Sequence, residues 1–172
     1  FLEKNNIFIN EIMDYTSAEN KGLFLEGTGS MVFDRLNKKA YCSISERTNE
    51  HLIYEFCNDF EYMPIVFNSF HTHKNERKPI YHTNVMMCNG THYSVICLDA
   101  IDDQAEMKKV VESLEDDNKE IITISEEQLK LFAGNMIELR KNKNSFLFMS
   151  ETAYLSLEEN QLKRLKAHSE LI

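Results

Sequence analysis

The feature that most constrains this chain is a succession of elements that returns about every 50 to 56 residues. In each round, two short apolar strands joined by a turn precede a helical stretch and a further strand. The first round covers residues 23–67, the second covers residues 85–124, and the third begins at Met136. An internal repeat of this period is typical of propeller-like or array architectures. We therefore predict an α/β fold built from repeated ββαβ units.

The spacing of apolar residues locates the individual elements. Strands are expected over residues 7–12, 23–33 (with a corner at Gly27 and Gly29), 40–44, 63–67, 85–88, 93–98, 120–124, 136–139 and 146–149, and another begins at Leu171. Helices are expected from Ser45 onward, over residues 102–114 and over residues 158–168. A short further helix begins at Ser125, because Ser125 and Gln128 have the spacing of a capping box.

Charge and cysteine content narrow the class of protein. The 172 residues, 42% of them hydrophobic, suffice for one well-buried domain. A net charge of −9 argues against binding to nucleic acid or to an anionic membrane, because both require a surplus of Lys and Arg. Cys42, Cys57, Cys88 and Cys97 form no CxxC pair and lie in apolar patterns. We therefore expect buried, reduced cysteines and a cytoplasmic protein.

The two ends of the chain lead to a further expectation. The chain begins without an initiator Met, and its last residues have the pattern of a strand that is just starting. We expect residues 1–172 to be a partial domain that is truncated at both ends. The sequence allows a homo-oligomer but does not fix the oligomeric state, because strand edges exposed by truncation could also create artificial contacts.

Two polar corners carry the residues best suited to chemistry. Glu26 lies in the stretch LEGTGSM at residues 25–31, and His82 lies in YHTNVMM at residues 81–87. A carboxylate can bind a cation and an imidazole can exchange protons near neutral pH. Taken singly, Glu26 could be a solvated residue before a turn and His82 a structural histidine. Their equivalent places in two successive units favour one shared active site.

Other polar residues are assigned smaller roles. Asn84 would share a strand face with His82 and could orient a ligand, and Asn135 occupies the equivalent corner of the third unit. Each could equally serve the backbone. His71 and His73 lie in an expected polar loop, and their spacing offers no complete metal site. Residues 115–117 are expected to form a solvated helix end.

Four stretches together resemble a known family. They are residues 25–31, residues 81–87, FAGNM at residues 132–136 and MSETAY at residues 149–154. The set resembles the amidinotransferase-like branch of the guanidine-modifying enzymes, nearest the citrulline-utilisation hydrolases and more distantly arginine deiminase and dimethylarginine hydrolase. The resemblance covers nearly the whole chain. It implies the pentein fold, an α/β propeller of five ββαβ units, of which this chain would hold about three.

The resemblance also implies a mechanism that needs neither a metal nor a cofactor. A cysteine thiolate attacks the carbon of a guanidino or ureido group, a covalent intermediate forms, and water or an acceptor amine resolves it. Glu26 matches the acidic residue that binds the substrate nitrogens, and His82 matches the acid/base histidine. Asn84 departs from the aspartate of the deiminases, which puts the exact substrate in doubt. The family's nucleophilic cysteine lies beyond this chain, so the segment alone should be inactive.

Three hypotheses follow for the whole protein. The first is a hydrolase or amidinotransferase that acts on an arginine-like small molecule. The second is an inactive protein of the same fold that binds such a ligand. The third is a structural module, which would require Glu26 and His82 to point apart. The sequence leaves open the substrate (arginine, citrulline, a methylated arginine or another guanidine) and the choice between hydrolysis and amidino transfer.

Overall fold

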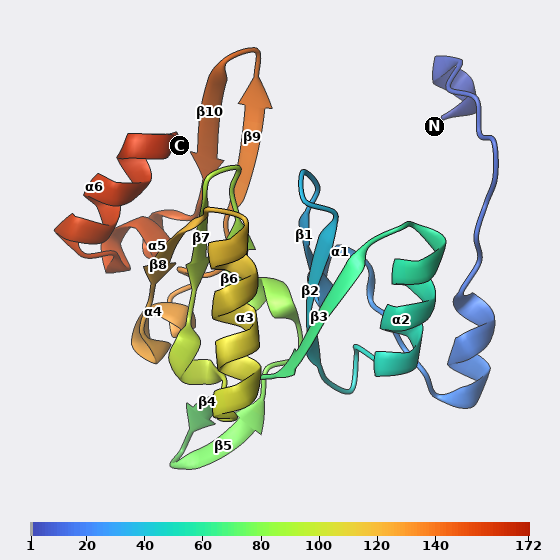
Figure 1. Cartoon of the computed structure of the whole chain (residues 1–172), viewed down its shortest axis with the longest axis horizontal. Coiled ribbons are helices and arrows are strands. Elements are labelled where there is room, and N and C mark those ends of the chain that lie inside the picture. The colour runs from blue at the N-terminus through green and yellow to red at the C-terminus, as the bar shows by residue number, and fades with distance from the viewer. Residues whose placement is uncertain (1) are drawn as a thin grey trace.

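Three small sheets with the same topology organise the computed structural model, which describes residues 2–172 (Figure 1). Each contains an antiparallel pair of strands, and a third strand joins the second member of that pair in parallel. The strands are β1 (Met31–Asp34), β2 (Lys39–Ile44) and β3 (Met63–Asn68); β6 (Met87–Asn89), β7 (Tyr93–Ile96) and β8 (Glu120–Thr123); and β9 (Ile137–Lys141), β10 (Asn144–Phe148) and β11 (Glu170–Leu171). None of these sheets closes on itself within the described residues.

Helices connect the second and third strand of each sheet. They are α2 (Glu50–Asp59) in the first sheet, α3 (Gln104–Asp116) in the second, and α5 (Glu151–Ser156) with α6 (Glu159–His168) in the third. A connection between parallel strands needs such a crossover, because a tight turn reverses the chain direction and can join only antiparallel strands. The predicted strand–strand–helix–strand succession is therefore confirmed in all three sheets. The fold is mixed α/β.

The first strands of the three sheets lie beside one another. Strand β1 packs against β6, and β6 packs against β9. The main core lies around these strands and under the helices, and its largest fully buried side chains include Tyr41, Phe67, Met86, Met87 and Tyr93. A second apolar cluster lies between the first sheet and α2 and contains Cys42 and Cys57. All four cysteines are free and buried, as predicted.

The structure corrects two expected strands. Residues 7–14 carry no strand, and no strand of the described residues pairs with them, so the ladder of hydrogen bonds that would define one is missing. Residues 27–30 form the helical turn α1 (Gly27–Ser30) where a strand was expected. Gly27 has a φ of +49°, a backbone angle that few other residues adopt and that turns the chain at this corner.

Helix α2 begins five residues later than predicted. The chain first makes a tight turn in which Ser45 and Thr48 exchange backbone hydrogen bonds. The side chain of Asn49 then accepts hydrogen bonds from the backbone amides of His51 and Leu52 and so caps the helix. The capping box predicted for α4 (Glu126–Lys130), between Ser125 and Gln128, is present.

The predicted polar loop around His71 is a strand. Strands β4 (Phe70–His73) and β5 (Glu76–Pro79) form an antiparallel hairpin, and Lys74 and Asn75 turn the chain with positive φ angles. Arg77 of this hairpin pairs with Asp102, which precedes α3, and with Glu126, the first residue of α4. These ion pairs hold an otherwise polar hairpin against the fold.

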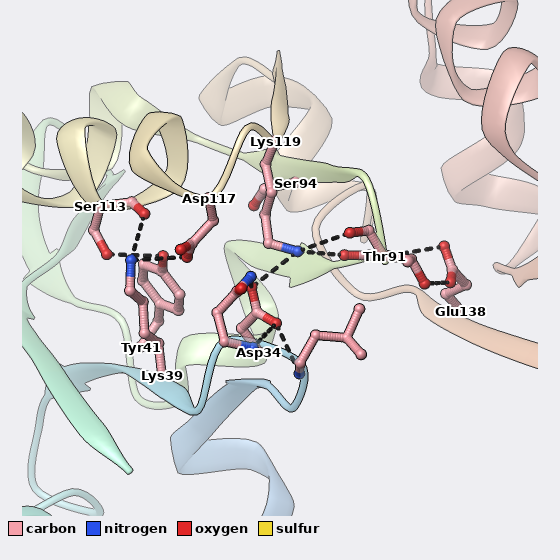
Figure 2. Close-up of polar contacts among 12 residues, drawn as sticks. Asp34, Lys39, Tyr41, Thr91, Ser94, Ser113, Asp117, Lys119 and Glu138 are labelled. Carbon is pink, nitrogen blue, oxygen red and sulfur yellow. Dashed lines mark hydrogen bonds and ion pairs between the residues drawn. The ribbon is translucent and has the colours of Figure 1, made fainter.

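A buried charged network joins the first two sheets (Figure 2). Lys119 lies 3.0 Å from Asp34, and their side chains are 1% and 3% exposed. Lys119 also donates hydrogen bonds to the carbonyls of Gly90 and Thr91. Close by, Lys39 forms an ion pair of 2.8 Å with Asp117. Residues 115–117 were expected to form a solvated helix end; Glu115 and Asp116 are exposed as predicted, but Asp117 is covered by Lys39 of the first sheet.

Candidate active site

Glu26 and His82 lie in contact, although 56 positions separate them in the chain. Glu26 precedes α1, and His82 precedes the single turn η3 (Thr83–Val85). The Nε2 atom of His82 lies 3.0 Å from the Oε2 atom of Glu26. The histidine side chain is 18% exposed and the glutamate side chain 44%, so solvent and a small ligand can reach the pair. The two corners therefore form one acid–base pair, and the catalytic roles of its members stay predictions.

Gly29 makes room for the histidine. A Cβ atom at this position would lie 2.5 Å from the Nδ1 atom of His82. That distance is far below van der Waals contact, so the imidazole would have to shift. The imidazole thus packs directly on the backbone of α1. This close approach explains the second glycine of the stretch LEGTGSM in physical terms.

Arg47 also contacts Glu26, and the sequence pattern had not identified it as a site residue. Its guanidinium lies 3.6 Å from Oε2 of Glu26, and its Cζ atom lies 5.1 Å from the centre of the Tyr81 ring. The Arg47 carbonyl also accepts hydrogen bonds from the Glu26 amide and the Ser30 hydroxyl. Arg47 lies in the tight turn between β2 and α2, where the sequence pattern placed the start of a helix. A basic residue three positions past a strand end was the available signal.

Asn84 and Asn135 meet at a neighbouring corner. The side-chain amide of Asn135 donates a hydrogen bond of 2.9 Å to the Asn84 carbonyl. A Cβ atom on Gly134 would lie 2.5 Å from the Val85 carbonyl oxygen, so this loop also packs closely on η3. The prediction that Asn84 and His82 share a strand face was wrong, because residues 83–85 form a 3₁₀ turn. A ligand-binding role for Asn84 and Asn135 stays a prediction.

Both asparagines line a cavity of the described residues. It has a volume of about 710 Å³ and lies among the first strands of the three sheets, with walls from residues of β1, β6 and β9. Glu26 and His82 are absent from its lining. The asparagine corner therefore belongs to this cavity, and the acid–base pair lies outside its lining. The pair is the better candidate for chemistry, because it places a carboxylate and an imidazole in direct contact, whereas Asp34 in the cavity wall is already paired with Lys119.

The four cysteines are poor nucleophiles. Burial raises the pKa of all four thiols, to about 11 for Cys57 and to about 12 for Cys88 and Cys97, and strongly for Cys42 as well. Each is therefore a neutral thiol at physiological pH, whereas the attacking species in thiol catalysis is the thiolate. This agrees with the prediction that none of them is the nucleophile of a guanidine-modifying enzyme.

The described residues carry neither a cluster of metal-ligating side chains nor a helix able to span a membrane. Residues 2–172 contain no group of three or more His, Cys, Asp or Glu side chains arranged to hold a metal ion. His71 and His73, whose ring centres lie 6.4 Å apart, belong to a hairpin and to no such group. No helix in the described range has the length and apolar character required to cross a lipid bilayer.

Comparisons with known proteins extend these findings. A family model described as "N,N dimethylarginine dimethylhydrolase, eukaryotic" matches residues 1–172. No curated protein matches the chain. Among solved structures, the substrate-bound N-terminal domain of ArgZ, an arginine dihydrolase from the ornithine–ammonia cycle in cyanobacteria, has a TM-score of 0.67 and 18% identity over 99% of this chain and 54% of that domain. The apo structure of ArgZ also has a TM-score of 0.67, with 14% identity over 99% of this chain and 24% of that protein.

These likenesses support the fold. The chain spans about half the length of the ArgZ domain that it matches. At 18% and 14% identity, similarity of structure says how the backbone is arranged and leaves the chemistry to be argued from the site.

Proposed function

This chain belongs to the eukaryotic N,N-dimethylarginine dimethylhydrolase family, and on that premise we propose that the full protein cleaves a C–N bond at the guanidino or ureido group of an arginine-like small molecule. The observation that carries the proposal is the contact of 3.0 Å between the Glu26 carboxylate and the His82 imidazole. One member can hold a cationic group and the other can move a proton, and solvent reaches both. The ArgZ domain, whose fold this chain shares, was solved with its substrate bound.

The proposed reaction begins with a thiolate from outside the four buried cysteines. Its sulfur forms a bond to the guanidinium carbon, and the electrons of the C=N bond move onto nitrogen. Glu26 accepts hydrogen bonds from the substrate N–H groups and stabilises their positive charge. His82 donates a proton to the departing nitrogen as the C–N bond breaks. An amine leaves, and a thiouronium adduct stays on the enzyme.

Water resolves the adduct in the proposed second step. Neutral His82 removes a proton from a water molecule, whose oxygen forms a bond to the same carbon. The C–S bond then breaks, which releases a ureido product and restores the thiolate. The same histidine thus acts as an acid and then as a base. An acceptor amine in place of water would make the reaction an amidino transfer, so the choice of acceptor decides the class of product.

Arg47 is proposed to bind the opposite end of the substrate. An arginine-like compound carries a carboxylate at its amino-acid end, and Arg47 is a half-exposed cation at the edge of the acid–base pair. Its planar guanidinium suits a carboxylate, which it can bind through two parallel hydrogen bonds. Asn84 and Asn135 are proposed to assist substrate binding from the neighbouring corner.

Arg47→Ala is expected to raise KM about 10- to 100-fold and to change kcat by less than about threefold. Lost charged hydrogen bonds of this kind are worth about 1.5 to 3 kcal/mol, and a contact made equally before and during the reaction affects KM alone. Steady-state kinetics of the full-length protein would measure both constants. Lys166→Ala, the same change of charge at an exposed position of helix α6, is the control and should leave KM unchanged. An unaltered KM in Arg47→Ala would refute this role.

We further propose that the three sheets are three of the five units of a pentein propeller, and that residues 1–172 are part of that domain. Support comes from the shared topology of the sheets and from the packing of β1, β6 and β9 beside one another. The remaining units would supply the nucleophilic cysteine. A cytoplasmic location and a small-molecule substrate complete the proposal, in keeping with four free cysteines and a net charge of −9.

The test is an activity assay on the full-length protein with a panel of guanidino and ureido compounds that includes arginine, citrulline and methylated arginines. Release of ammonia, amine and ureido product is measured, with an iodoacetamide-treated sample as control. Turnover of one compound that the alkylation abolishes would establish the class of enzyme. Ligand-dependent thermal stabilisation without turnover would instead favour an inactive binding protein of this fold. The absence of both turnover and binding would refute both functions.

A further inference from the structure

Thr83, the residue after His82, is completely buried and makes two hydrogen bonds to the first unit. Its hydroxyl donates a hydrogen bond of 2.6 Å to the Ser30 carbonyl and accepts one of 2.8 Å from the Ser43 backbone amide. Ser30 is the last residue of α1, and Ser43 belongs to β2. One side chain of the second unit thus joins two elements of the first unit that flank the site.

The connection continues from Thr83 to Glu26. The hydroxyl of Ser30 donates a hydrogen bond of 3.2 Å to the Glu26 carbonyl. Two successive contacts therefore link the backbone that carries His82 to the backbone that carries Glu26. On the other side of the histidine, the Ser45 hydroxyl donates a hydrogen bond of 2.7 Å to the Tyr81 carbonyl. Both chain neighbours of His82 are held, and its ring rests on Gly29.

We propose that the Thr83 hydroxyl is a positioning group that sets the separation between His82 and Glu26. The inference rests on the proposed function, in which these two side chains act on one substrate. A displacement of about 1 Å at a reacting group can slow catalysis about 100-fold. The hydroxyl is suited to this role because it donates to one fixed backbone group and accepts from another. It touches no substrate and acts through His82.

The test compares three variants of the full-length protein. Thr83→Val keeps the shape of the side chain and removes both hydrogen bonds, and Thr83→Ser restores the hydroxyl. Thr48→Val is the matched control, because Thr48 is a completely buried threonine whose hydroxyl has no hydrogen-bond partner. Where Thr83→Val does not fold, Thr83→Cys replaces the hydroxyl with a weak thiol donor of similar size.

Thr83→Val is expected to lower kcat about 10- to 100-fold and to leave KM within about threefold. Thr83→Ser should recover kcat to within about threefold, and Thr48→Val should behave as the wild type. Equal rates in Thr83→Val and Thr48→Val would overturn the proposal. Equal losses in Thr83→Val and Thr83→Ser would also overturn it, because the methyl group would then matter and the hydroxyl would not.

A second measurement keeps this test separate from that of the proposed function. Long-range proton–nitrogen NMR spectra report the protonation and hydrogen bonding of each imidazole nitrogen, and the signals of His82 are identified by their loss in His82→Gln. Thr83→Val is expected to change the His82 signals, whereas Thr48→Val is not. A wild type without turnover would refute the enzyme, and the spectra would still decide the positioning role. Unchanged His82 signals in Thr83→Val would overturn it.

Discussion

Glu26→Gln in the full-length protein is expected to lower kcat by at least about 100-fold on the best substrate of the panel. Glutamine keeps the size of the side chain and removes the negative charge that faces both His82 and Arg47. In the proposed reaction that charge stabilises the cationic substrate, and its effect increases as charge shifts during attack of the thiolate. Steady-state kinetics with a single purified preparation would measure the loss.

The same substitution should leave the folded state almost unchanged. The Glu26 side chain is 44% exposed, and exposed ion pairs contribute about 1 kcal/mol or less to stability. Glu46→Gln removes the same charge from an exposed position nearby and is the control for both rate and thermal unfolding. A melting temperature that drops by many degrees in Glu26→Gln alone would make Glu26 a structural residue. An undiminished kcat would exclude it from catalysis.

Lys119→Met is expected to lower the free energy of unfolding by about 3 to 5 kcal/mol at neutral pH. The substitution leaves the Asp34 carboxylate buried without its cationic partner, and it also removes the hydrogen bonds to the carbonyls of Gly90 and Thr91. Figure 2 shows that Lys119 joins the first unit to the second at this point. Urea unfolding of the full-length protein would measure the loss, with Lys108→Met on the exposed face of α3 as control.

The pH dependence of that loss tests its cause. Burial raises the pKa of Asp34, but hydrogen bonds from Asn37 and Lys119 and the charge of Lys119 outweigh it, so the pKa is lowered overall. A carboxyl group with a lowered pKa stabilises the fold above its unfolded pKa of about 3.9, and this stabilisation is lost as the pH falls through the folded pKa. In Lys119→Met, Asp34 should protonate more readily, since a neutral carboxyl needs no partner.

The difference in stability between wild type and Lys119→Met should therefore shrink as the pH is lowered from 7 to about 3. The double variant Asp34→Asn/Lys119→Met should recover part of the loss at neutral pH, because it leaves no unpaired buried charge. A difference in stability that stays constant with pH would show that lost packing, and not the unpaired carboxylate, destabilises the variant.

Local patterns in the sequence were sufficient for several elements. Alternation of apolar residues located β2, β7 and β8 to within a few positions, and the pair Ser125 and Gln128 located the start of α4. Such features depend on neighbours two to four positions apart, which the sequence displays directly. The expected strand over residues 7–12 failed for the opposite reason, because a strand also needs a partner, and none of the described strands pairs with this segment.

The candidate site, like the fold, was predicted in part from local sequence patterns and decided in part by tertiary contacts. The sequence by itself determined that Glu26 and His82 stand at equivalent polar corners of a repeat, since turn residues and apolar strands are local signals. Only the tertiary structure decided that the two side chains meet at 3.0 Å, that Arg47 joins them, and that Lys119 pairs with Asp34 in the interior. Each of these contacts joins residues at least 21 positions apart. Their distances depend on how whole units pack, and that packing is a sum over many side chains that no short stretch of sequence records.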